Sequence, residues 1–406
     1  RAKIKHSSLI NDYCNGGLKD VDVRSKIKAL HLSWIQRLFD NNFHPWKLIP
    51  TFLFRKLSKC SNTIFYPNFC IEKEHLQRLP IFYKNLALNW IEFSHSTPIT
   101  TSSILSESIW NNAFITIGSC SIKATFFGIT DHLFVKDLLD ESGAFLAWNT
   151  FRQKYNLANN MFFKWIQLKN SLPKSWIKMT KTDLSIQYNL CNFTPHINNN
   201  ARIVSVDKLT SAEIYKILIT KIAKPPSSQT FFNEKFDVSE HWKHIYLIPR
   251  YATVDTYSRV FQYKVLNNIL FLNEKLFQFN LVQSPLCSLC GNVNESVEHL
   301  FCECSVTTEL WDSLRHHFQN NLPLDALTPQ SAVLGLINQP SETRNIVNHI
   351  LIIFKIFLFK NRAYCPSFIS LLAKIKSISE IEKLACSSKK QQEYFNQKWG
   401  NILDIM

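Results

Sequence analysis

Apolar residues recur at helical spacing along most of the chain, and this pattern predicts a mainly α-helical protein. The clearest case spans residues 25–39, where a stripe of apolar side chains runs along one predicted helix face. The stripe consists of Ile27, Leu30, Trp34 and Leu38. The basic residues off the stripe are Lys26, Lys28 and Arg37. We therefore expect an amphipathic helix that buries the stripe and exposes its basic side.

Further helices are predicted from their start and stop signals. Thr210 followed by Glu213 has the form of a capping box, and the helix should run to about Ile222 before Pro225-Pro226. Either Asp255 or Thr256 should cap the next helix, which leads towards residue 279. The apolar run 350–359, interrupted by Lys355, is too short to span a membrane and indicates a buried helix.

Two regions depart from the helical pattern. Short runs of Ile, Thr and Phe around Gly118 predict a small β-hairpin near residues 114–127. Residues 178–206 are rich in Asn, Thr and Ser and are predicted to form a linker loop. The expected fold class is mainly α with a small β-hairpin component. The expected segments are a basic helical segment (1–60), a mixed α/β segment (61–177), the linker (178–206), a helical segment (207–284), a segment rich in metal-binding residue types (285–318) and a C-terminal helical segment (319–406).

The strongest chemical signal is a cluster of metal-binding residue types. Cys287 and Cys290 lie two residues apart, so one tight turn can direct both thiolates at a single point, and Gly291 lets the backbone leave that turn. His299 and Cys304 then complete a set of four ligands, so we expect the helical body to carry a CCHC zinc knuckle at residues 285–318. Because protein groups fill all four positions, we expect one structural Zn²⁺ with no site for an activated water.

Alternatives to this ligand set remain. Cys302 competes with Cys304 for the fourth position, as do His316 and His317. We favour Cys304, because a helix that begins near Val306 would place it at the helix entry. The simpler interpretation is that the cysteines are reduced thiols in a buried loop.

The order of these residues resembles the reverse-transcriptase zinc-binding domain of LINE-type (non-LTR) retrotransposons. The matching features are Cys287-x-x-Cys290, the acidic Glu295, His299-Leu300-Phe301-x-x-Cys304 and the later Trp311. Weaker likeness extends over most of the chain, from residues 15–22 and 28–35 through 259–264 to Lys398-Trp399.

The resemblance implies a C-terminal part of an RNA-directed DNA polymerase that binds template RNA or target DNA during target-primed reverse transcription. The chain has no adjacent Asp-Asp pair to hold the two catalytic metals, so we expect it to be no enzyme by itself. It starts at Arg1, which suits a piece of a longer reading frame. Its expected partners are RNA, DNA and the polymerase domain of the same parent protein, with no membrane.

The net charge favours a polyanionic partner. The formal charge is +15, and residues 1–60 hold 12 basic and 4 acidic side chains. Such a surface attracts phosphate backbones through counterion release. Our candidates for nucleic-acid contacts are Arg259, Lys264, Lys26, Lys28 and Arg37. A solvated basic face with no ligand is the alternative for each of them.

Two further expectations concern location and competing functions. Eleven irregularly spaced cysteines without a signal peptide favour a reducing compartment, so we expect an intracellular ribonucleoprotein of the nucleus and cytoplasm. Besides nucleic-acid binding, the sequence allows a helical scaffold or interaction module that zinc stabilises. It also allows an inactive relic of a transposable element.

Overall fold

The computed structural model describes residues 4–405, except for 40–41, 59–64, 67, 72, 95–103, 130–132, 141, 183–195, 200–201, 206–207, 325–326, 338 and 404. The chain folds into two compact units. Unit 1 contains Arg1–Val21 and Ala223–Met406, and unit 2 contains Asp22–Ile222. The boundary between Val21 and Asp22 falls inside the predicted basic helical segment 1–60.

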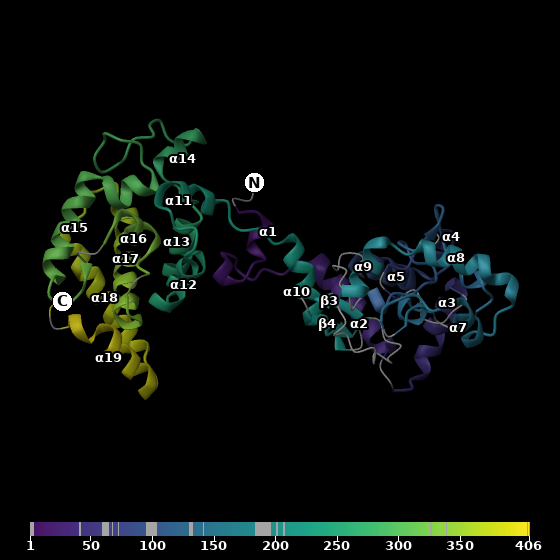
Figure 1. Cartoon of the computed structure of the whole chain (residues 1–406). Helices are drawn as coiled ribbons and strands as arrows, with labels where there is room; N and C mark the ends of the chain where they lie inside the picture. Colours follow the sequence, from purple (N-terminus) through teal and green to yellow (C-terminus); the bar gives the residue numbers. More distant parts are fainter. Residues whose placement is uncertain are drawn as a thin grey trace. The chain divides into compact units, whose positions relative to one another are not determined.

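Unit 2 combines helices with two short hairpins (Figure 1). Its helices are α2 (Val23–Phe39), α3 (Leu48–Ser58), α4 (Lys73–Gln77), α5 (Ile81–Ser94), α7 (Trp148–Lys154), α8 (Phe162–Ser171), α9 (Lys174–Thr182) and α10 (Ser211–Ile222). Its strands are β1 (Thr116–Ile117), β2 (Cys120–Ser121), β3 (His196–Asn199) and β4 (Arg202–Ser205). Both hairpins are antiparallel.

The first hairpin confirms the strand prediction, and the second changes the loop prediction. Thr116 pairs with Ser121 and Ile117 with Cys120, inside the predicted range 114–127. Within residues 178–206, α9 continues to Thr182, and β3 and β4 follow. This region is therefore not a loop throughout.

Helix α2 forms as predicted but buries a different face. Leu38 is buried as expected, whereas Ile27, Leu30 and Trp34 are 50%, 49% and 38% exposed. The buried positions include Ala29, Leu32 and Ile35. They lie on the face that packs in one core with α5 and α10. The predicted stripe was wrong because α2 is apolar on two faces, and periodicity alone does not say which one meets its neighbours.

A second core of unit 2 surrounds a buried carboxyl group. Glu107 is 1% exposed, and its two oxygens accept hydrogen bonds from Nδ2 of Asn68 and Nδ2 of Asn112, both at 2.8 Å. Burial raises the pKa of Glu107 to about 8, and these two bonds only partly oppose that effect. Phe151 and Trp165 belong to this second core, and their rings stack with centroids 4.3 Å apart.

Unit 1 is built from helices. They are α1 (His6–Leu9), α11 (Ser228–Phe236), α12 (Trp242–Ala252), α13 (Thr256–Leu266), α14 (Asn273–Gln278), α15 (Ser305–Phe318), α16 (Pro329–Leu334), α17 (Ser341–Asn361), α18 (Phe368–Ala385) and α19 (Lys389–Leu403). Helix α17 lies at the centre, and α12, α13, α18 and α19 pack against it (Figure 1). Residues 346–358 of α17 are all buried, which confirms the predicted buried helix.

The predicted helix caps are present. Glu213 accepts hydrogen bonds from the backbone N–H and the hydroxyl of Thr210, both at 2.8 Å, and Thr210 accepts one from the Glu213 N–H. Asp255 caps α13 by accepting hydrogen bonds from the N–H groups of Tyr257 and Ser258. Of the two residues proposed for this cap, Asp255 is therefore the one used.

Within unit 1, two glycines allow close packing of residues 4–21. Gly16 has φ +78°, and a Cβ there would lie 2.6 Å from the Tyr246 ring. A Cβ on Gly17 would lie 2.0 Å from the carbonyl oxygen of Asn11. Only glycine allows so close an approach. The side chain of Asn11 also donates to the carbonyl of Lys224 at 2.7 Å. This bond links the N-terminal part of unit 1 to the start of its second part, which begins at Ala223.

Over the described ranges, none of the helices combines the length and the apolar character that crossing a lipid bilayer requires.

Candidate metal centre

A tight backbone loop positions the first two cysteines. The N–H of Cys287 donates to the carbonyl of Val293 at 2.7 Å, and the N–H of Gly291 donates to the carbonyl of Cys287 at 2.9 Å. Leu286 and Asn294 form an antiparallel bridge at the base of the loop. Gly291 has φ +68°, which agrees with its predicted role in leaving the turn. Residues 287–291 therefore form a tight turn, and the sulfurs of Cys287 and Cys290 both face the same cluster of four side chains.

A single π-helical turn positions the other two residues. It covers His299–Glu303, and Cys304 follows as the N-cap residue of α15. The N–H of Cys304 donates to the carbonyl of His299 at 2.8 Å, and the N–H of His299 donates to the Ser296 hydroxyl at 3.1 Å. The prediction that Cys304 stands at the entry of a helix is confirmed.

The four side chains converge on one point. One ligand atom from each of Cys287, Cys290, His299 and Cys304 lies within 4.8 Å of all the others. The sulfurs of Cys287 and Cys304 are 4.0 Å apart, and Cys290 Sγ lies 3.3 Å from His299 Nε2. Tetrahedral zinc with Zn–S of about 2.3 Å and Zn–N of about 2.0 Å requires ligand separations of about 3.5–3.8 Å. The donor set and its spacing therefore fit a tetrahedral metal ion.

The competing ligands do not join this cluster. Cys302 Sγ points to the carbonyl of Pro329, 3.5 Å away. His317 Nε2 lies 2.9 Å from the carbonyl of Ile405, and His316 is exposed on α15. Among the described residues, the convergent group is the set with Cys304.

The surroundings of Cys287 and Cys290 shift the pKa values of their thiols in opposite directions. Burial raises the pKa of Cys287 to about 12. Burial also acts on Cys290, but the N–H groups of Asn292 and Val293 and the His299 ring outweigh it and lower the pKa of Cys290 to about 6. Cys290 therefore gives up its proton more readily than Cys287, which needs further stabilisation to become a thiolate. A bound cation would provide that stabilisation, so metal binding should release protons.

Glu295 fixes the loop to the rest of unit 1. Its side chain is 0% exposed. One oxygen accepts from the N–H of Asn273 at 3.1 Å, the first residue of α14, and the other accepts from the N–H of Ser288 at 3.1 Å. Arg362, just after α17, lies 3.5 Å from the same carboxylate. The sequence singled out Glu295 only through the family resemblance, because these partners are distant along the chain.

The cluster is continuous with the hydrophobic core. Cys287 and Cys304 are core members together with Leu300 and Phe301. Trp311 donates from Nε1 to the carbonyl of Phe301 at 2.9 Å. Since four protein donors occupy a site closed by core residues, the arrangement suits a structural metal and leaves no open coordination position.

The candidate nucleic-acid contacts in unit 1 have different surroundings. Arg259 donates from Nε to the carbonyl of Thr253 at 2.7 Å and from Nη2 to the carbonyl of Arg250 at 3.2 Å. Its guanidinium therefore closes the turn between α12 and α13. Lys264 is exposed on α13.

The candidates in unit 2 all lie on α2. Lys26 is exposed, and its Nζ lies 5.5 Å from the ring centre of Tyr215. Lys28 forms an ion pair with Glu92 at 2.7 Å. Arg37 lies over an indole ring of its own helix at 5.5 Å. Of the three, Lys28 is the one already neutralised by a carboxylate.

A family comparison agrees with the site geometry. Residues 209–311 match a family described as zinc-binding in reverse transcriptase. The match begins just before α10, contains all four converging residues and ends at Trp311. No curated protein matches the chain at a significant level. The reverse-transcriptase zinc-binding match thus covers the site, while the likeness noted elsewhere in the chain and the LINE-type subtype stay predictions.

Proposed function

We propose that this chain is the C-terminal, non-catalytic part of a non-LTR retrotransposon reverse transcriptase that binds template RNA or target DNA. In this proposal a structural zinc ion shapes unit 1, and basic side chains supply the attraction to phosphate. The polymerase active site would lie in another part of the parent protein. The observation that carries the proposal is the convergence of three thiols and one imidazole inside the matched segment.

The chemistry of the donors favours zinc. Three sulfurs and one nitrogen form a soft donor set, and tetrahedral S/N sites of this kind are typical of structural zinc. Cys287 and Cys290 would hold the ion from the loop, and His299 and Cys304 from the π-helical turn and the start of α15. The ion would join the loop to the π-helical turn and the start of α15, so part of its binding free energy would be folding free energy.

The charge of the chain supports a nucleic-acid ligand. The formal charge is +15. A polyanion releases condensed counterions when it binds such a surface, which gives affinity with little sequence preference and strong salt dependence. Exposed Lys26, Arg37 and Lys264 are the candidates whose side chains are free of a carboxylate ion pair in the described structure.

The test is binding of the full chain to single-stranded RNA and to nicked duplex DNA as salt rises from about 50 to about 200 mM. We expect binding at low salt and a steep loss at high salt. A zinc-loaded, folded chain that binds neither ligand at low salt would contradict nucleic-acid binding. It would favour the second candidate, a zinc-stabilised scaffold. The observation that supports this second candidate is that Cys287 and Cys304 belong to the hydrophobic core of unit 1.

A further inference from the structure

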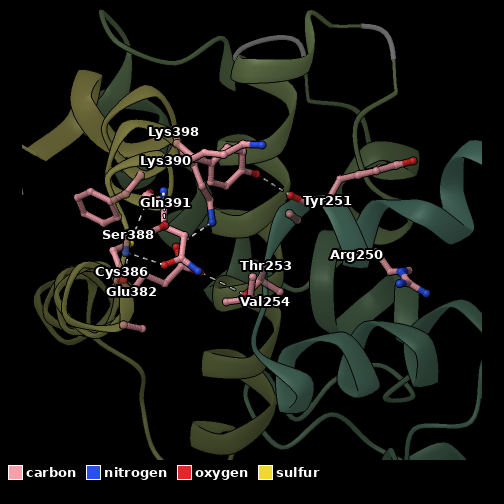
Figure 2. Close-up of a pocket in the computed structure, with 14 residues that line it drawn as sticks. Arg250, Tyr251, Thr253, Val254, Glu382, Cys386, Ser388, Lys390, Gln391 and Lys398 are labelled. Atoms are coloured by element: carbon pink, nitrogen blue, oxygen red, sulfur yellow. Dashed lines mark hydrogen bonds and ion pairs between the residues drawn. The ribbon is translucent and has the colours of Figure 1, made fainter.

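A cavity of about 570 Å³ opens in unit 1, away from the metal centre. It lies between the end of α12 with the residues that follow, the end of α18, and α19 (Figure 2). Its size falls within the range of about 300–1,000 Å³ that is usual for pockets that bind small molecules.

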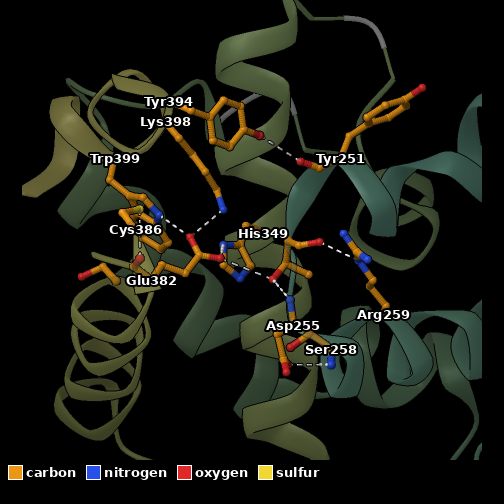
Figure 3. Close-up of polar contacts among 12 residues, drawn as sticks. Tyr251, Asp255, Ser258, Arg259, His349, Glu382, Cys386, Tyr394, Lys398 and Trp399 are labelled. Atoms are coloured by element: carbon orange, nitrogen blue, oxygen red, sulfur yellow. Dashed lines mark hydrogen bonds and ion pairs between the residues drawn. The ribbon is translucent and has the colours of Figure 1, made fainter. Parts of the chain in front are cut away.

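Two exposed tyrosines line the cavity. Tyr394 is 48% and Tyr251 is 54% exposed, and Val254, which also lines the cavity, is 69% exposed. The Tyr251 ring points away from Tyr394 and Glu382, so the Tyr394 ring is the one available for stacking (Figure 3). The hydroxyl of Tyr394 donates to the carbonyl of Tyr251 at 3.4 Å, which links α19 to the end of α12 (Figure 3). Phe395 also lines the cavity and is buried. The Tyr394 ring suits a flat, unsaturated ring, because aromatic faces stack on such rings.

The cavity is also lined by the carboxylate of Glu382, one oxygen of which can accept further hydrogen bonds. One oxygen of Glu382 accepts from Lys398 Nζ at 2.8 Å and from Trp399 Nε1 at 2.7 Å. The other oxygen has only distant partners, the Thr253 hydroxyl at 3.4 Å and His349 Nδ1 at 3.7 Å (Figure 3). A carboxylate oxygen accepts more than one hydrogen bond. This oxygen therefore suits the N–H groups on the edge of a nucleobase.

The rim is basic. Arg250 lines the cavity and is held over the Tyr13 ring at 4.2 Å, and Lys390 lines it from the start of α19. With Lys398, three cationic side chains line the cavity, and Lys398 is the one that forms an ion pair with Glu382, at 2.8 Å. The combination of an aromatic ring, a carboxylate acceptor and a cationic rim is complementary to one nucleotide: base inside, phosphate at the edge.

We propose that this cavity binds one unstacked base of a single-stranded nucleic acid. The proposal rests on the nucleic-acid-binding function proposed above and adds to it a site that binds only unpaired bases. A paired base in a duplex is stacked and cannot enter, so the site distinguishes single strands and unpaired ends from duplex.

The test measures binding of the full, zinc-loaded chain to a single-stranded RNA of about 16 nucleotides and to a duplex of the same sequence. Tyr394→Ala should weaken binding to the single strand about tenfold, which is the effect of losing one base–aromatic stack. The salt slope should stay unchanged, because no phosphate contact is lost. Duplex binding should also be unaffected.

Three further variants serve as controls. Tyr394→Phe keeps the ring and should bind like the parent chain. Tyr364→Ala removes a 77% exposed tyrosine outside the cavity and should have no effect. Tyr251→Ala removes an exposed ring that points away from Tyr394 (Figure 3), so it should weaken binding to the single strand less than Tyr394→Ala does.

The outcomes separate this proposal from the function on which it rests. Failure of the parent chain to bind any nucleic acid rejects both. Normal binding of the parent chain with no loss in Tyr394→Ala rejects the cavity alone. Equal losses in Tyr394→Phe and Tyr394→Ala, or equal losses on duplex and single strand, also reject base stacking in the cavity.

Discussion

The two units differ in what they contribute. Unit 2 carries 24 basic and 13 acidic residues, whereas unit 1 carries 22 basic and 18 acidic residues. Unit 1 in turn contains the four residues that could hold a metal ion and the cavity near Tyr394. Most of the net positive charge and the candidate metal site thus belong to different parts of the chain. Attraction to phosphate and zinc-dependent folding should therefore be separable by experiment.

The largest expected effect is the loss of the metal. Cys304→Ser should reduce the zinc content from about one per chain to about zero and remove hydrogen-exchange protection in unit 1 around α15, while unit 2 stays protected. Structural zinc sites contribute about 10–16 kcal/mol of apparent free energy in small zinc peptides, so the local effect should be large. Metal analysis and peptide-resolved hydrogen exchange measure both parts.

Matched substitutions sharpen this result. Cys287→Ser should behave like Cys304→Ser, and Cys302→Ser should keep its zinc, because the Cys302 sulfur points to Pro329. Unchanged zinc in both ligand variants would overturn the ligand assignment. Equal loss of protection in both units would overturn the separation between them.

The second effect is a pH dependence of unit 2. The folded pKa of Glu107 is about 8, raised from its ordinary value of 4.5 mainly by burial. Its contribution to stability is therefore fully present below pH 4.5 and is lost as the pH rises through about 8. One proton gives a slope of at most about 1.4 kcal/mol per pH unit. Hydrogen exchange in unit 2 should show this loss, and Glu107→Gln should flatten it. An identical slope in the variant would exclude Glu107 as the cause.

Unit 1 should respond to pH in the opposite direction. Burial and the positive charge of Lys398 hold the pKa of His349 well below its ordinary value of 6.5. The folded state therefore loses stability as the pH falls below 6.5, because the unfolded chain takes up a proton that the buried ring does not. His349→Phe should reduce this loss between pH 7 and 5, with the same limiting slope of about 1.4 kcal/mol per pH unit. A variant as acid-sensitive as the parent chain would show that other groups are responsible, such as the metal-binding thiols.

The smallest effect concerns single phosphate contacts. If unit 2 provides most of the electrostatic attraction, Lys26→Ala and Arg37→Ala should each weaken nucleic-acid binding and reduce the salt slope by about one. Lys28→Ala is the matched control on the same helix and should change less, because Glu92 already neutralises Lys28. A slope that responds to Lys264→Ala but to none of the α2 variants would place the attraction in unit 1 instead.

Local sequence signals predicted local structure well. The Cys287–Cys290 turn, the position of Cys304 before α15 and the caps at Thr210 and Asp255 each depend on residues within a few positions of one another. Such geometry follows from backbone hydrogen bonding and residue preferences alone.

Features that depend on distant residues were not predictable in this way. Glu295 meets Asn273 and Arg362 only after the helices of unit 1 have packed. The cavity brings together residues near 251 and near 394, which no sequence periodicity connects. Helix α2 shows the same limit. It has two apolar faces, and which of them is buried depends on the packing of α5 and α10.

X-ray absorption at the zinc edge of the full chain, purified under reducing conditions, tests the central claim most directly. The account predicts one zinc per chain with three sulfur ligands at about 2.3 Å and one nitrogen ligand at about 2.0 Å. A folded chain without bound transition metal, or a zinc shell made mainly of oxygen, would contradict it.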